Sequence, residues 1–85
     1  MAKYIIKNNL PDEIHNALER RYGTFVNMGT STARNMFLKT VYFLNNYTEA
    51  FIVDINYRSE KRKPLRGTIQ VEIDGFYYYV ELYKE

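Results

Sequence analysis

The clearest pattern in this chain is an alternation of apolar and polar residues on both sides of Asp74-Gly75. Asp-Gly favours a two-residue hairpin turn, because both central positions of that turn need positive φ. A hairpin centred there pairs Ile73 with Phe76, Val71 with Tyr78 and Ile69 with Val80 on one face. The other face carries Thr68, Gln70, Glu72, Tyr77, Tyr79 and Glu81. The sequence therefore predicts a hairpin with one core-facing side and one side of tyrosines among polar and acidic groups.

The first third of the chain predicts a short strand at residues 4–7 and then a helix. Leu10-Pro11-Asp12-Glu13 is typical of a helix start, because proline fits the first turn and acids suit the positive end of the helix dipole. Apolar side chains then recur at helical spacing at Leu10, Ile14, Ala17, Leu18 and Tyr22. Gly23 is suited to the position just after the last turn.

A second helix is predicted after Thr30-Ser31-Thr32, which supply candidate N-caps. Its apolar stripe consists of Ala33, Met36, Phe37, Val41 and Leu44. Residues 34–44 also suit a strand that turns at Asn45-Asn46, since Met, Phe, Val and Tyr are good strand formers. Alternation would then place Lys39 on the same face as Phe37 and Val41, so we favour the helix.

Residues 50–57 alternate as a strand, with Phe51, Val53, Ile55 and Tyr57 expected to face inward and Ile52, Asp54 and Asn56 outward. A basic loop at 58–66, marked by Pro64, leads to the Asp-Gly hairpin. The predicted fold class is α+β in a single domain, residues 1–85: a short N-terminal strand, two helices, then a three-stranded antiparallel β-meander packed on the helices. Helices on one side would leave the tyrosine face of the sheet open.

The composition argues against several classes of function. The 85 residues allow one core, and there is no Cys and one His, so we expect no disulfide, no metal site and no cofactor. Without a Gly-rich phosphate loop or a paired-His motif, we expect no enzymatic activity, no catalytic residues and no small-molecule substrate. The start of the chain lacks the pattern of a signal peptide and no apolar run could span a membrane, so we expect a cytoplasmic protein without membrane contacts.

The tyrosine face is the first candidate site. It comprises Tyr77, Tyr79, Tyr83, Ile52, Glu72 and Glu81. Tyrosine is enriched in interfaces, and acids on the same face would repel phosphates, so we expect a protein partner or a homodimer. The alternative is that these tyrosines are simply good strand formers. Abundant Tyr, Asn, Ile and Lys suggests an AT-rich gene, as in many phages, which favours an inhibitor or adaptor of a host protein.

The net charge is only +2, but its distribution indicates a second candidate site. Five cations crowd the basic loop: Arg58, Lys61, Arg62, Lys63 and Arg66. Such a cluster can track a phosphate backbone, with Lys7, Thr30 and Ser31 as further contacts, so a dimeric nucleic-acid-binding regulator is the alternative function. A solubilising loop is the competing interpretation.

Residues 4–44 also resemble ribbon-helix-helix DNA-binding proteins. The similarity lies in Tyr-Ile-Ile-Lys-Asn-Asn running into a Leu-Pro-type helix start, and in Gly29-Thr30-Ser31 before the second helix. The resemblance implies that the N-terminal strand pairs with its twin in a dimer and enters the major groove. It further implies that Lys7 and Asn9 face bases, while Thr30 and Ser31 hold the DNA backbone.

Overall fold

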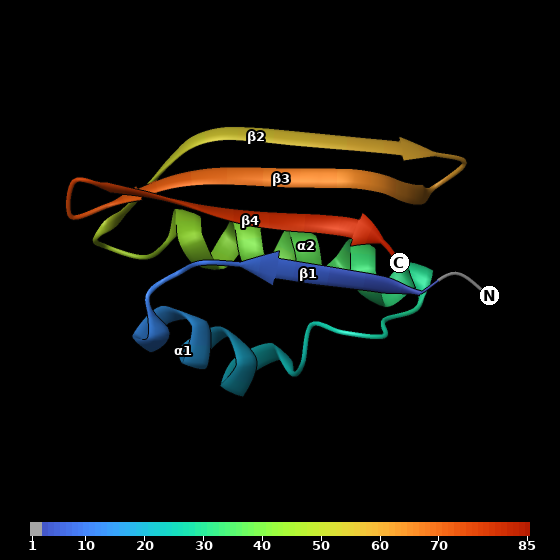
Figure 1. Cartoon of the computed structure of the whole chain (residues 1–85), viewed down its shortest axis with the longest axis horizontal. Coiled ribbons are helices and arrows are strands. Elements are labelled where there is room, and N and C mark those ends of the chain that lie inside the picture. The colour runs from blue at the N-terminus through green and yellow to red at the C-terminus, as the bar shows by residue number, and fades with distance from the viewer. Residues whose placement is uncertain (1–2) are drawn as a thin grey trace.

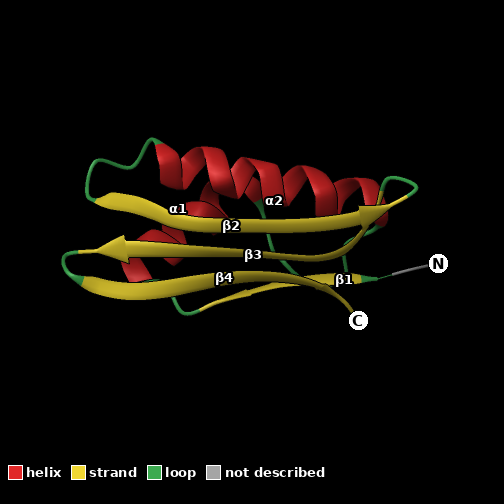
Figure 2. Ribbon diagram, turned by 90° about the horizontal axis from the view of Figure 1, so that it is seen from above, coloured by secondary structure: helices red, strands yellow, loops and turns green. Residues whose placement is uncertain are grey.

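The computed structural model describes residues 3–85, which form a four-stranded antiparallel sheet with helices on one side (Figures 1 and 2). The elements are β1 (Tyr4–Asn8), α1 (Asp12–Tyr22), α2 (Thr30–Asn45), β2 (Ala50–Glu60), β3 (Lys63–Ile73) and β4 (Phe76–Lys84). The strand order is β1-β4-β3-β2, so the N-terminal strand adds to the far side of the C-terminal meander. The predicted α+β architecture is confirmed. No helix among these residues is long and apolar enough to cross a membrane.

The β3–β4 hairpin has the predicted register. Ile73 lies opposite Phe76, Val71 opposite Tyr78 and Ile69 opposite Val80. Ile69, Val71 and Val80 are almost fully buried beneath the helices, because alternation directs all three to the same side of the sheet. This face of β3 and β4 is the floor of the hydrophobic core.

The helices supply the other wall of the core. Residues 34–44 are helical, as favoured, and Ala33, Met36, Phe37 and Leu44 of α2 are buried. Ile14 and Leu18 of α1 join the same cluster. The predicted side-chain N-caps of α2 are wrong: Gly29 occupies the N-cap and Thr30, Ser31 and Thr32 already lie in the first turn, where no side-chain capping bond is found.

Strand β2 departs from the predicted orientation. Its pairing with β3 shifts between Ile52 and Asp54, which leaves Val53 as a bulge residue. Ile52 therefore lies opposite buried Val71 and packs against the core, although it was expected to face outward. Phe51 lies opposite Glu72 on the outer face, although it was expected to face inward. Val53 is also exposed, and only the part of the strand beyond the bulge has the expected orientation.

The basic segment is a hairpin rather than a loop. β2 continues to Glu60 and β3 begins at Lys63, so Lys61 and Arg62 alone form the connecting turn. Both residues have positive φ, 52° and 65°. Pro64, which was expected to mark a loop, is a buried residue of β3. The five cations are therefore held on a pair of strands and their turn.

Candidate protein-binding face

The side of the sheet that faces away from the helices is called the open face here. Antiparallel partners share a face, so the register assigns its rows of side chains. From the Asp-Gly turn toward the other end, these rows are Phe51–Glu72–Tyr77, Asp54–Gln70–Tyr79, Asn56–Thr68–Glu81–Lys7 and Arg58–Arg66–Tyr83–Ile5. The open face thus has an aromatic and acidic end and a cationic end.

Exposed apolar side chains gather at the aromatic end. Phe51 is 68% exposed, Tyr77 61%, Val53 53% and Tyr79 41%. We call these four residues the apolar patch. Beside it lies a hollow of about 340 Å3, whose lining includes Asp54, Gln70, Tyr77 and Tyr79. Rigid aromatic rings around a hollow with carboxylate and amide groups are typical of protein-contact surfaces.

The remaining predicted residues of this site are spread along the open face. Glu72 lies within the aromatic end, between Phe51 and Tyr77. Glu81 lies one row beyond Tyr79, and its Oε2 is 3.4 Å from Nη2 of Arg66. Tyr83 is half-buried at the cationic end. Ile52 is not part of this face, so five of the six predicted residues lie on it.

Sequence reasoning missed Phe51 and Val53, which are more exposed than Tyr79. The missed signal is the run Ala50-Phe51-Ile52-Val53, in which four consecutive apolar residues break the alternation. Such a run does not fix which side chains face the core. The bulge then places two exposed apolar side chains near Tyr77 and Tyr79.

The five cations of residues 58–66 lie together at the opposite end of the sheet from the apolar patch. Arg58 and Arg66 face each other across β2 and β3, and like charges in that position repel. Arg34 of α2 donates from Nη1 to the carbonyl oxygen of Arg62 at 3.2 Å. This bond places the first turns of α2 beside the Lys61-Arg62 turn, with Thr30 and Ser31 one turn earlier. Lys7 lies apart from them, paired across strands with Glu81 on the open face.

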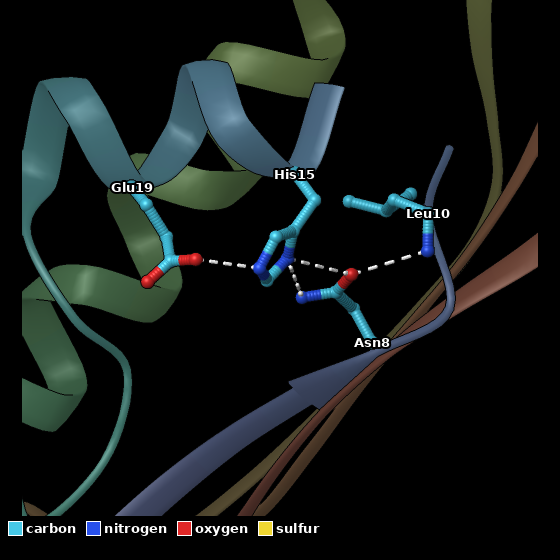
Figure 3. A network of polar contacts seen from close by, with 4 residues as sticks. All are labelled: Asn8, Leu10, His15 and Glu19. Carbon is cyan, nitrogen blue, oxygen red and sulfur yellow. Dashed lines mark hydrogen bonds and ion pairs between the residues drawn. The ribbon is translucent and has the colours of Figure 1, made fainter. Parts of the chain in front are cut away.

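The single histidine ties α1 to β1 (Figure 3). Asn8 Oδ1 accepts from the N–H of Leu10 at 3.1 Å, which leaves Asn8 Nδ2 to donate to His15 Nδ1 at 3.2 Å. His15 Nε2 then donates to Glu19 Oε1 at 2.6 Å. Both ring nitrogens are thus engaged in contacts that position the helix. Residues 3–85 contain no group of three or more His, Asp or Glu side chains placed to hold a metal ion.

Strand β1 is not arranged as the ribbon-helix-helix resemblance implies. It pairs with β4 on one side, and on the other Tyr4 and Ile6 bond to the backbone of the segment after α1, at Met28 and Phe25. Both edges are therefore occupied within one chain, which leaves no edge for a twin strand. Asn9 Oδ1 accepts from the N–H of Tyr79 at 2.8 Å, so this side chain is engaged with β4.

No protein-family model, curated protein or solved structure matches this chain.

Proposed function

We propose that this chain is a small non-enzymatic protein-binding module that inhibits or adapts a larger protein. Its contact surface is the aromatic end of the open face. The observation that supports this function is the concentration of exposed apolar side chains at Phe51, Val53, Tyr77 and Tyr79. A rim of acids at Asp54 and Glu72 would orient a partner with complementary basic groups.

The position of the apolar patch in the fold supports this proposal. Tyr77 and Tyr79 are carried by β4, which pairs with β3 along both residues, and Asn9 holds the backbone of Tyr79 on the other side. Aromatic side chains on a hydrogen-bonded strand lose little entropy on binding, because only their two side-chain torsions must be fixed. The acids of the same face disfavour a phosphate backbone as the ligand there.

One observation favours nucleic-acid binding as a second candidate function. Among the described residues, the facing pair Arg58 and Arg66 forms one ion pair, between Arg66 and Glu81, and it lies near the Lys61-Arg62 turn. A hollow of about 300 Å3 is lined by Asn56, Arg58, Arg66 and Thr68. Phosphate binding at this end would weaken steeply with added salt, because the bound phosphates release counterions.

Pull-down from cell lysate with Tyr77→Ala/Tyr79→Ala tests the protein-binding function. The double variant should lose a partner that the wild-type chain retains, with affinity reduced at least about 30-fold if one tyrosine is an interface hot spot. Thermal unfolding should remain close to that of the wild type, because both side chains lie on an exposed face.

The matched control is Tyr42→Ala, which removes a similarly exposed tyrosine (64%) from the solvent side of α2. It should retain every partner. Equal partner sets for the double variant and the wild type would rule out the aromatic end as the contact surface. Salt-sensitive binding of a DNA or RNA probe, lost on reversing the charges of Lys61, Arg62 and Lys63, would favour the second candidate.

A further inference from the structure

The two edges of the sheet differ in whether their backbone groups are hydrogen-bonded. The outer edge of β1 is closed by the backbone bonds of Tyr4 and Ile6 to Met28 and Phe25. Strand β2 is the other edge and is longer (Figure 1). Within residues 3–85 no segment pairs with its outer side, so its outward backbone groups remain available to another strand. An open edge of this kind accepts an added strand readily.

The side chains of β2 specify which strand would fit. Between the bulge at Val53 and Arg58 the strand pairs regularly with β3. In an antiparallel pair of β2 strands with a two-fold axis perpendicular to the sheet, opposite residues share a face. Centring the axis on Asn56 places Asp54 of each copy opposite Arg58 of the other, and Ile55 opposite Tyr57. This register forms two charge pairs of opposite sign.

The neighbouring registers lack this complementarity. An axis at residue 54 brings the two Asp54 carboxylates together, and an axis at residue 58 does the same for the two Arg58 side chains. An axis at residue 57 places Asp54 opposite Glu60. An axis at residue 55 forms no ion pair. An axis at residue 59 also pairs opposite charges, Arg58 with Glu60, but it overlaps only the last residues of β2. Like charges directly opposite destabilise a strand pair, so charge pattern and length of overlap together select the register at Asn56.

Apolar side chains on the helix side of this edge favour the same contact. Ile55 is 44% exposed although it lies on the core-facing side of β2. Leu38 of α2 is 56% exposed. It lies one helical turn after Arg34, which reaches the β2–β3 turn, so it is on the side of α2 away from α1. A second copy at the edge would remove part of this apolar surface from water.

We propose that two copies of this chain form a two-fold symmetric dimer by antiparallel pairing of their β2 strands, with Asn56 at the axis. The dimer is a continuous eight-stranded sheet with all four helices on one side. The two open faces then form one continuous surface, in which the aromatic end of each copy lies beside the cationic end of the other. This proposal does not depend on the proposed function, because it uses the edge of the sheet rather than the apolar patch.

A charge-swap experiment tests the register. Asp54→Arg and Arg58→Asp each turn both ion pairs into repulsive pairs in the homodimer, which should weaken it about 10- to 100-fold. An equimolar mixture of the two variants restores both attractive pairs in a heterodimer. Sedimentation velocity measures the affinities, and native mass spectrometry with one isotope-labelled variant identifies the heterodimer. Recovery of wild-type affinity in the mixture is the expected result.

Two controls separate this interface from other effects. Arg20→Asp makes the same charge change on an exposed residue of α1 and should leave the dimer unchanged. Tyr77→Ala/Tyr79→Ala should also dimerise normally, even where it loses a protein partner. The proposal is overturned if the wild-type chain is monomeric at about 100 μM, where a micromolar dimer would predominate. It is equally overturned if mixing the two variants yields no heterodimer.

Discussion

Strand β3 forms a hairpin with each of its neighbours, and the two hairpins are closed by turns of equal length and very different sequence. Asp74-Gly75 closes β3–β4, and Lys61-Arg62 closes β2–β3. All four residues have positive φ, between 52° and 85°. Asp-Gly favours this conformation intrinsically, whereas Lys and Arg avoid it. One turn is therefore formed by local chemistry, and the other must be held by the structure around it.

The structure around the Lys61-Arg62 turn shows what holds it. The carbonyl oxygen of Arg62 accepts from Arg34 of α2. One turn further along α2, Phe37 stacks on Tyr57 with ring centroids 5.4 Å apart and packs against Gly67. Tyr57 and Gly67 are direct partners in β2 and β3. Helix α2 thus clamps the β2–β3 hairpin near its turn, whereas the β3–β4 hairpin needs no such contact to fix its register.

Substituting Gly67 should break the β2–β3 hairpin most severely. A Cβ at this position would lie 2.8 Å from Cε1 and 2.9 Å from Cζ of Phe37. The ring is buried and stacked on Tyr57, so it has little room to move. Gly67→Ala should lower the free energy of unfolding by about 2 to 3 kcal/mol, as expected for overpacking in a core. Urea denaturation followed by circular dichroism measures this change.

A double-mutant cycle sharpens the interpretation. Phe37→Leu replaces the ring that obstructs the new methyl group with a shorter side chain. Gly67→Ala should therefore be less destabilising in that background than in the wild type. Gly29→Ala is the control, because no atom lies within 4 Å of its Cβ position and its φ is −73°. It should change stability by about 0.5 kcal/mol or less, because alanine is a poorer N-cap than glycine but loses less backbone entropy on folding. Additive effects at Gly67 and Phe37 would exclude the clamp by α2.

The Asp74-Gly75 turn should respond next most strongly. Gly75 has φ of 85° and no atom within 4 Å of its Cβ position, so a substitution there strains the backbone without causing a clash. Gly75→Ala should lower the free energy of unfolding by about 1 to 2 kcal/mol. Thermal unfolding beside Gly29→Ala measures the difference. If the two variants were equally stable, the turn would not rely on its glycine.

The comparison of the two hairpins also explains which parts of the fold and of the candidate site could be predicted from the sequence. Every pair of the β3–β4 hairpin follows from Asp74-Gly75 and the alternation around it, and with it the positions of Tyr77, Tyr79 and Glu72. The second helix was favoured because a strand at residues 34–44 would place Lys39 on the same face as Phe37 and Val41. These features are determined by residues that are close together in the sequence, so the pattern of a single sequence is enough to predict them.

The β2–β3 hairpin was predicted poorly because its determinants are distant in sequence. The bulge at Val53 reverses the orientation of Phe51 and Ile52, and the apolar run at residues 50–53 does not fix which of its side chains face the core. The Lys61-Arg62 turn has no Gly or Asn, so a longer loop was expected. Its conformation depends on α2, more than twenty residues earlier, through Arg34 and Phe37. For this reason the predicted site omitted Phe51 and Val53, whose exposure depends on the pairing of β2 with β3.

The smallest expected effect is a gain in stability, from a glycine in the Lys61-Arg62 turn. Arg62 has φ of 65°, which destabilises an L-residue with a side chain by about 1 kcal/mol, whereas glycine adopts this conformation freely. Arg62→Gly keeps the carbonyl oxygen that accepts from Arg34, so it should raise the free energy of unfolding by less than about 1 kcal/mol, the gain being reduced by the entropy of glycine in the unfolded chain. Lys63→Gly is the matched control. It removes the same charge one residue later, in the extended backbone of β3, where glycine should destabilise by about 0.5 to 1 kcal/mol. Opposite shifts of the unfolding midpoint in the two variants would show that backbone strain, rather than charge, distinguishes the Lys61-Arg62 turn from Asp74-Gly75. A lower midpoint for both would mean that the Lys61-Arg62 turn is unstrained.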